Sequence, residues 1–244
     1  MTANNNPASE PNSEISAEQA RAAINTLITA FDSQVNAGQW TVQASREQMF
    51  TELFGWWAWI NNNSKLVLLA HDNGRGHEAA PNVRSILEHA VFMQWVLDDE
   101  DAARAAISAK ADDNQRKLFD DAQAQNWTIP DDISRAEPVP QTMLSFAALC
   151  ARYGAKDSYI AYRMLSAHVH PSAKGTEAYL DLETTRVLRS YVERPAQPDL
   201  VLIAICLIQT AQVMDSLTSD RPLAATINEA NAHFSHRITP LTRE

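Results

Sequence analysis

A cluster of chemically active side chains occupies the segment YRMLSAHVHP, which begins at position 162. On a helix that turns by about 100° per residue, Arg163, Ser166 and His170 fall within roughly 60° of one another. His168 points away from that face. A guanidinium binds phosphate through a fork of donors, and an imidazole exchanges protons near neutral pH. The segment therefore predicts a polar helix face suited to phosphate binding or proton transfer.

The same face also has a purely structural interpretation. In that alternative, Arg163 lies in solvent, Ser166 bonds its own helix and His170 caps free carbonyl groups. Pro171 disfavours the helical conformation at His170, so the helix is expected to end there. The negative end of the helix dipole favours a protonated imidazole at this place. The residues of this segment leave both interpretations open.

A second polar group lies in the segment RSILEH, which begins at Arg84. Arg84 and Glu88 are four positions apart, so their side chains share a helix face and can pair. Apolar neighbours place the pair at the edge of the core, where charged groups need partners. We expect the face of Ser166 and His170 to supply those partners. The resulting buried network is either catalytic or architectural.

Hydrophobic periodicity predicts an all-α fold, a multi-helix bundle of about eight or nine helices. Ser16 and Gln19 have capping-box spacing before the first helix, and Gly38 ends it. Pro81 suits the first turn of the third helix. The expected helices cover approximately residues 16–35, 45–70, 81–97, 98–125, 141–152, 157–169, 176–191, 199–219 and 222–236.

The domain organisation follows from composition. Residues 1–15 are polar and rich in Asn, Pro and Ser, so they are expected to form a disordered tail. Residues 16–244 are expected to form a single helical domain. Only 6 of 244 residues are glycine, which argues against an all-β fold with its frequent turns.

Charge and motif content restrict the function classes. The net charge of -10 disfavours long-range attraction to nucleic acid, so RNA binding would need a local basic pocket. Glu-x-x-His pairs, His-Glu-x-x-His and phosphate-binding glycine loops are absent, so neither a metal nor a cofactor is expected. Cys206 lies in an apolar run and predicts a buried thiol. The longest apolar run has 9 residues, too few to span a membrane, and no signal peptide is evident, so a cytoplasmic location is predicted.

Two long segments resemble a large bacterial helical family that is catalogued only as a domain of unknown function. They are NVRSILEHAVFMQWVLDDEDAARAA and, further along, YRMLSAHVHPS. Members of that family carry an Arg-Ser-x-x-Glu helix, an acidic turn and a Ser-x-x-x-His-Pro-like segment. Arg84, Glu88, Ser166 and His170 match these motifs here, and the similarity covers about residues 45–180. The resemblance implies an all-helical fold and no particular activity.

A different feature resembles the HEPN ribonucleases, whose motif is an arginine and a histidine with four to six residues between them. Arg163 and His170 leave six residues between them, and Arg163 and His168 leave four. The resemblance implies a homodimer that cleaves RNA without a metal, in a defence or toxin-type system. It also implies that Arg163 stabilises the phosphate while the histidine assists attack by the 2′-hydroxyl. Met164 departs from the polar residue that usually follows the arginine.

Three functions therefore remain open at this point. The first is a HEPN-like ribonuclease with Arg163 and His170 as catalytic residues and RNA as the partner. Its supporting network would consist of Arg84, Glu88, Ser166 and His168. The alternative is a non-catalytic interaction protein that binds a protein partner and whose network fixes helix register. The third is a small-molecule site lined by Trp56, Trp59 and Trp95.

Overall fold

The computed structural model describes residues 15–130, 135, 143–169, 175, 177–181, 187–188, 190 and 192–244. Within these residues the fold is all-α apart from one short antiparallel β-ladder. The elements are α1 (Ala17–Ala37), the 3-10 turn η1 (Ala44–Arg46), α2 (Glu47–Asp72), α3 (Ala80–Ala124), α4 (Phe146–Arg152), α5 (Lys156–Val169), β1 (Leu180–Asp181), β2 (Val187–Leu188), α7 (Ala196–Ser216) and α8 (Ala224–Asn231).

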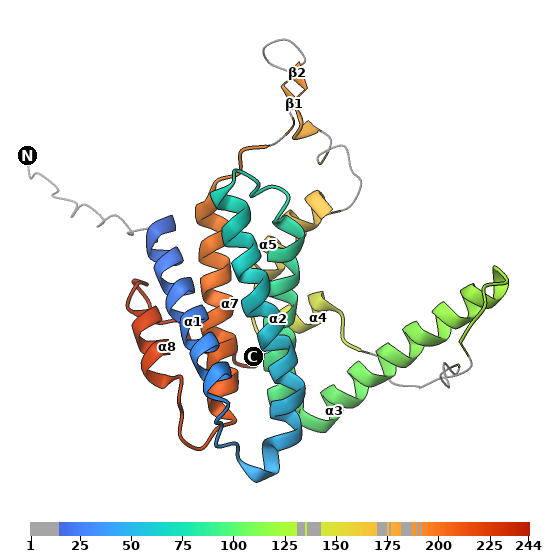
Figure 1. Cartoon of the computed structure of the whole chain (residues 1–244), viewed down its shortest axis with the longest axis horizontal. Helices are drawn as coiled ribbons and strands as arrows, with labels where there is room; N and C mark the ends of the chain where they lie inside the picture. Colours follow the sequence, from blue (N-terminus) through green and yellow to red (C-terminus); the bar gives the residue numbers. More distant parts are fainter. Residues whose placement is uncertain are drawn as a thin grey trace, which may run out of the picture.

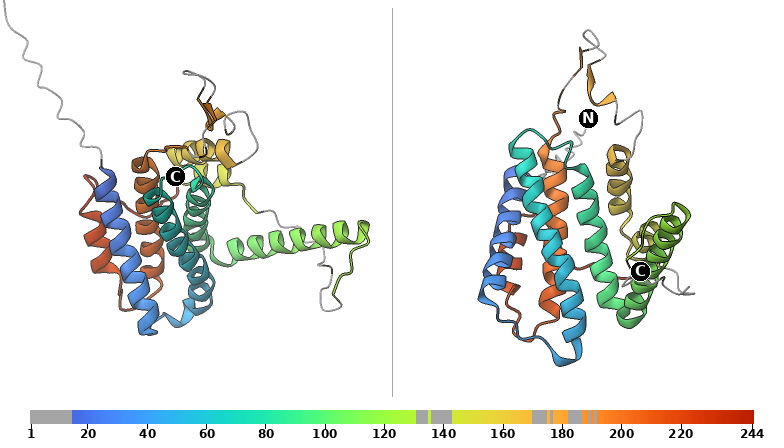
Figure 2. Two further views of the ribbon diagram at one scale, coloured as in Figure 1. Left: turned by 45° about the horizontal axis from the view of Figure 1, so that its top comes forward. Right: turned by 45° about the vertical axis from the view of Figure 1, so that its right-hand side comes forward.

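Helix α7 lies in the middle of the bundle (Figure 1 and Figure 2). Helices α1, α2, α3 and α8 all pack against it. Among the described residues, α7 is the one helix whose length and apolar composition would allow it to cross a membrane. Because 67% of its most apolar window is buried inside the protein, core packing explains that composition.

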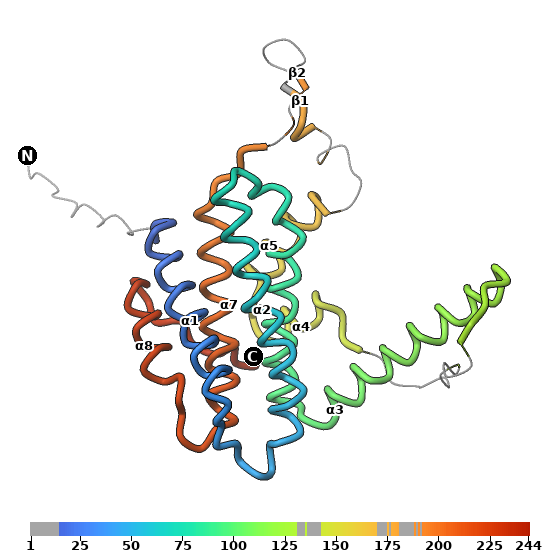
Figure 3. The backbone as a smooth tube through the Cα atoms, viewed as in Figure 1, coloured from blue at the N-terminus to red at the C-terminus, as the bar shows by residue number. Residues whose placement is uncertain are grey.

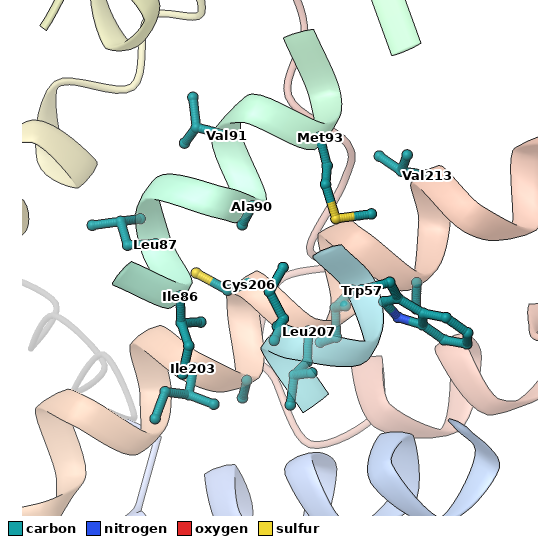
Figure 4. Close-up of a cluster of buried hydrophobic side chains, with 14 of the residues drawn as sticks. Trp57, Ile86, Leu87, Ala90, Val91, Met93, Ile203, Cys206, Leu207 and Val213 are labelled. Atoms are coloured by element: carbon teal, nitrogen blue, oxygen red, sulfur yellow. The ribbon is translucent and has the colours of Figure 1, made fainter. Parts of the chain in front are cut away.

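The core that surrounds α7 includes side chains of α2 and α3. Figure 4 shows Trp57 from α2 and Met93 from α3 near Ile203, Cys206 and Leu207 from α7. All of these side chains are buried. Burial raises the pKa of the Cys206 thiol to about 12, which confirms the predicted buried thiol.

The first helix begins and ends where its sequence predicts. The Ser16 hydroxyl accepts a hydrogen bond from the Gln19 amide at 3.1 Å. The Gln19 side-chain oxygen accepts in return from the Ser16 amide at 2.9 Å, which completes the capping box. Gly38 ends the helix with φ of 62°, a conformation that glycine adopts without strain.

The third and fourth expected helices are joined in α3. Glu100 breaks the helical geometry with φ of 46° and ψ of -118°, and beyond it the helix turns away from the bundle (Figure 3). This break lies within about three residues of the expected boundary between the helices at 81–97 and 98–125, and Asp98 and Asp99 come just before it. The Tyr153 hydroxyl donates to Asp98 at 2.8 Å, and Arg152 donates to Asp99 at 2.8 Å. These carboxylates hold the end of α4 against the kink in α3.

The prediction of a helix at residues 176–191 is wrong for residues 180–181 and 187–188, which form β1 and β2. Leu180 and Asp181 pair with Leu188 and Val187 in an antiparallel ladder. The Leu188 side chain is 80% exposed, so an apolar helix face here would have no core to cover. With α3 counted as one helix across its kink, the described residues form seven α-helices, so the expected count of eight or nine is slightly too high. Residues 1–14 lie outside the described residues, and the division into a tail and a single domain stays a prediction.

A largely buried polar triad joins the end of α2 to the start of α7. His71 Nε2 lies 3.2 Å from the Asp199 carboxylate, and Arg194 donates two hydrogen bonds of 2.7 Å to the same carboxylate. Burial by itself raises the pKa of Asp199, but the hydrogen bonds from His71 and Arg194 outweigh it and hold that pKa below its ordinary value. The ionised carboxylate is therefore stabilised in the folded protein.

Replacing Leu207 by alanine tests the central position of α7. Leu207 is 1% exposed, so Leu207→Ala should lower the free energy of unfolding by about 2–5 kcal/mol, through lost burial and a new cavity. Urea denaturation measures this loss. Leu69→Ala, at a side chain that is 59% exposed, is the control and should change stability by less than about 0.5 kcal/mol. Equal losses for the two variants would contradict the arrangement.

The Asp199 triad predicts a dependence of stability on pH. Because its folded-state pKa lies below the unfolded value, Asp199 contributes stability above pH 3.8, and this contribution is lost as the pH falls through the folded value. Asp199→Asn should therefore lower the melting temperature at pH 7 and flatten its decline below pH 4. Thermal melts across this range are the measurement. A variant whose acid-induced loss matches that of the wild type would exclude the linkage.

Candidate functional site

The packing of α5 on α3 decides which side chains of the candidate segment face the protein. Leu165 is buried at 3% exposure and points into the core. The Tyr162 ring packs against Phe146 of α4, with ring centroids 4.6 Å apart. Arg163 and Met164 are consequently exposed on the outer side of α5. Tyr162 and Leu165 thus fix the rotation of this helix about its axis.

Arg84 forms the main polar contact between α3 and α5. One of its terminal nitrogens donates to the Tyr162 hydroxyl at 2.6 Å, and the guanidinium carbon lies 4.5 Å from the Tyr162 ring centroid. The Glu88 carboxylate lies 3.8 Å from the same terminal nitrogen. The structure thus brings Arg84 and Glu88 together as expected, with side chains 18% and 28% exposed. Arg84 Nε is buried and has no hydrogen-bond partner among the described residues.

Ser166 uses its hydroxyl within its own helix. The hydroxyl donates to the Tyr162 carbonyl oxygen at 2.7 Å. It lies one turn from the residue that binds Arg84, so both contacts meet at Tyr162. This contact of Ser166 therefore lies within its own helix, and Tyr162, not Ser166, is the residue of α5 that binds Arg84.

Arg163 has a different environment from the other described arginines. Every other arginine that the structure describes takes part in an ion pair or a hydrogen bond. Arg163 has neither within the described part of the chain, and it lies exposed beside Ile160 and Met164, which are 56% and 67% exposed. Its guanidinium is therefore available to an anion from solution.

Two imidazoles meet beyond the polar end of α5. The rings of His168 and His77 lie 4.9 Å apart in an edge-to-face arrangement, although His77 belongs to the turn that precedes α3. The Tyr179 ring packs on His77 at 5.4 Å, and its hydroxyl donates to Glu78 at 2.9 Å. His170, the histidine expected to be catalytic, lies outside the described residues.

Sequence reasoning missed Tyr162, His77 and Tyr179 as parts of this region. Tyr162 stands four positions before Ser166, so helical spacing alone could have placed it on the same face. His77 and Tyr179 have no such signal, because they reach His168 only through the tertiary arrangement.

The tryptophans do not form the single lining that was expected. Trp59 stacks on His89 with ring centroids 4.3 Å apart. Trp56 borders a cavity of about 660 Å³ between α2 and the kink of α3, and neither other tryptophan lines it. Trp95 is 3% exposed, and its indole nitrogen donates to Asp99 at 2.7 Å. Trp56 also packs on His89, at 5.9 Å between ring centroids, so Trp56 and Trp59 meet at this histidine, whereas Trp95 binds Asp99 instead.

A comparison with protein families matches the part of the chain that holds these residues. The sequence model of DUF5677, a family of unknown function, matches residues 50–186, which is 137 of 244 residues. The chain belongs to this family. The first resemblance is thereby confirmed, whereas the DUF5677 match carries no ribonuclease assignment. No curated protein and no solved structure matches the chain.

The matched part of the chain, residues 50–186, begins within α2 and contains α3, α4 and α5. It separates into two groups of side chains with different chemistry. The inner group of Arg84, Glu88, Tyr162 and Ser166 is joined by hydrogen bonds and an ion pair. The second group consists of the exposed guanidinium of Arg163, which has no partner among the described residues, and the imidazole of His168, which packs on His77. The described residues hold no cluster of three metal-binding side chains.

Removing Arg84 tests whether the inner group holds α5 in place. Arg84→Ala leaves the Tyr162 hydroxyl and the Glu88 carboxylate without their shared partner, so the free energy of unfolding should fall by about 1–3 kcal/mol. Chemical denaturation measures the change. Arg163→Ala is the matched control on the exposed side and should stay within about 0.5 kcal/mol of the wild type. An Arg84→Ala variant with the same free energy of unfolding as the wild type would show that Arg84 does not hold α5 in place.

Proposed function

We propose that this DUF5677 protein is a HEPN-like ribonuclease that works without a metal ion. Arg163 would bind the phosphodiester, and His170 would transfer a proton, with His168 beside them. The observation that supports the proposal is the free, exposed guanidinium of Arg163 in a protein whose other described arginines are all engaged. Such a guanidinium can bind two phosphate oxygens through parallel N–H donors.

The proposed reaction uses only groups of the chain and of RNA. The 2′-hydroxyl oxygen attacks the adjacent phosphorus, and an imidazole accepts its proton. The bond from phosphorus to the 5′-oxygen breaks, and that oxygen receives a proton from an imidazolium or water. The products are a 2′,3′-cyclic phosphate and a free 5′-hydroxyl. Arg163 would neutralise the charge that gathers on the phosphate oxygens during attack.

The proposal extends to the partner and the location. RNA is the substrate, and a homodimer would bring two copies of Arg163 into one cleft. A net charge of -10 disfavours RNA at long range, so two adjacent guanidinium groups would supply the local positive charge that binding requires. A cytoplasmic place in a defence or toxin-type system belongs to the same proposal.

A second candidate is a non-catalytic interaction protein. It is favoured by the inner group, in which Arg84 and Ser166 already bond within the protein. The polar region between α3 and α5 would then fix helix register. The exposed Ile160 and Met164 on α5 would contact a protein partner.

Incubation of the purified protein with a mixed RNA pool separates the candidates. The wild type should cleave the pool in the presence of a metal chelator and leave cyclic phosphate ends. Arg163→Ala and His170→Ala should each slow cleavage by about 10²-fold or more without lowering the melting temperature.

Lys156→Ala is the matched control, because it removes an exposed positive charge from the same helix. It should retain wild-type cleavage. An intact RNA pool with and without added divalent metal, or full activity in Arg163→Ala, would rule out the ribonuclease and leave the interaction protein.

A further inference from the structure

A separate cavity lies at the junction of α2, the turn after it and the loop that leads into α7. Its volume is about 440 Å³, which is in the range of small-molecule sites. The residues that line it are His71, Gly74, Gly76, Glu193, Arg194 and Pro195. None of these residues belongs to the polar region between α3 and α5. The cavity is therefore independent of the proposed ribonuclease site.

The floor of the cavity carries a histidine whose orientation is fixed. The His71 side chain is only 3% exposed, and its Nε2 lies 3.2 Å from the Asp199 carboxylate. The pKa of Asp199 lies below its ordinary value, so this carboxylate is ionised and accepts the Nε2 hydrogen. In the neutral ring, Nδ1 then carries the lone pair. Nδ1 has no hydrogen-bond partner among the described residues.

The Cε1 and Nδ1 edge of the ring lies beside Gly76, which lines the cavity together with His71. A Cβ atom on Gly76 would lie 2.3 Å from His71 Cε1 and 2.4 Å from Nδ1. Gly76 is thus needed to leave room for this edge, and both residues line the cavity. Asp199 holds the opposite edge and does not line the cavity. A hydrogen-bond acceptor is therefore presented to whatever enters.

The charges around the cavity favour a cation. Arg194 donates two hydrogen bonds of 2.7 Å to Asp199, so these two charges compensate each other. Glu193 is exposed and has no ion pair or hydrogen bond within the described residues. Its carboxylate leaves the lining with one uncompensated negative charge. A bound anion would be repelled by the Glu193 carboxylate and by the lone pair of His71 Nδ1.

We propose that this cavity binds a small organic ammonium ion. One N–H group of the ligand donates to His71 Nδ1 and another to the Glu193 carboxylate, while its carbon chain lies against Pro195 and Gly74. An organic cation fits better than a metal ion, because the described residues contain no group of three metal-binding side chains. Replacement of either acceptor should weaken the site, although Glu193 can be changed without disturbing the fold.

Titration with n-butylammonium, with n-butanol as the uncharged match, tests the proposal. The readout is the ¹⁵N shift of His71 Nδ1 in histidine-labelled full-length protein, with sodium chloride compensating ionic strength. We expect a saturable shift with butylammonium and none with butanol. Glu193→Gln should weaken binding by about tenfold or more, since it removes the negative charge that no described lining residue compensates. Glu18→Gln, an exposed carboxylate on α1, should bind as the wild type does.

Gly76→Ala provides a second test that does not depend on charge. Its Cβ would displace the His71 ring edge, so binding should be lost. Equal affinity in Glu193→Gln, the absence of a saturable shift, or a shift with Zn²⁺ but not with butylammonium would overturn the proposal. In each of those cases the triad of His71, Asp199 and Arg194 would be purely structural. The outcome is independent of RNA cleavage, so failure of one proposal leaves the other standing.

Discussion

Burial of α7 is the constraint on which the other elements depend. This helix is apolar on nearly every side, so it is stable only when other helices cover it. Helices α1, α2, α3 and α8 do so. By packing one face against α7, α3 leaves another face free for α5. The polar region between α3 and α5 therefore exists because the apolar side of α3 is occupied elsewhere.

The contact between Arg84 of α3 and Tyr162 of α5 determines which side of α5 is exposed. It combines a hydrogen bond of 2.6 Å with a guanidinium over the aromatic ring, so it constrains both the position and the rotation of α5. With Tyr162 turned inward, the next residue, Arg163, points to solvent. The buried contact of Arg84 with Tyr162 thus determines that the Arg163 guanidinium has no partner among the described residues. The proposed phosphate binding depends on this unpaired guanidinium.

The turn between α2 and α3 connects the two proposed sites. It is preceded by His71, which is held by Asp199 of α7, and it contains His77, which contacts His168 of α5. The glycine at position 76 lies between these histidines and allows the chain to pass close to the first imidazole. Two imidazoles in different electrostatic environments therefore come from one short stretch of chain. The first is held by the Asp199 carboxylate, and the second packs on His168 near the end of α5.

The sequence alone determined the features that depend on neighbours within a few residues. Ser16 and Gln19 close the capping box, Gly38 ends α1, Pro81 lies in the first turn of α3, and Arg84 pairs with Glu88 four positions away. The all-helical class and the family resemblance followed from the same local patterns. Tertiary structure decided the rest. Asp98 and Asp99 bind the end of α4 beside the kink, and His71 meets Asp199 across the bundle. Such contacts depend on the rotation and register of packed helices, which the core sets and local spacing cannot specify.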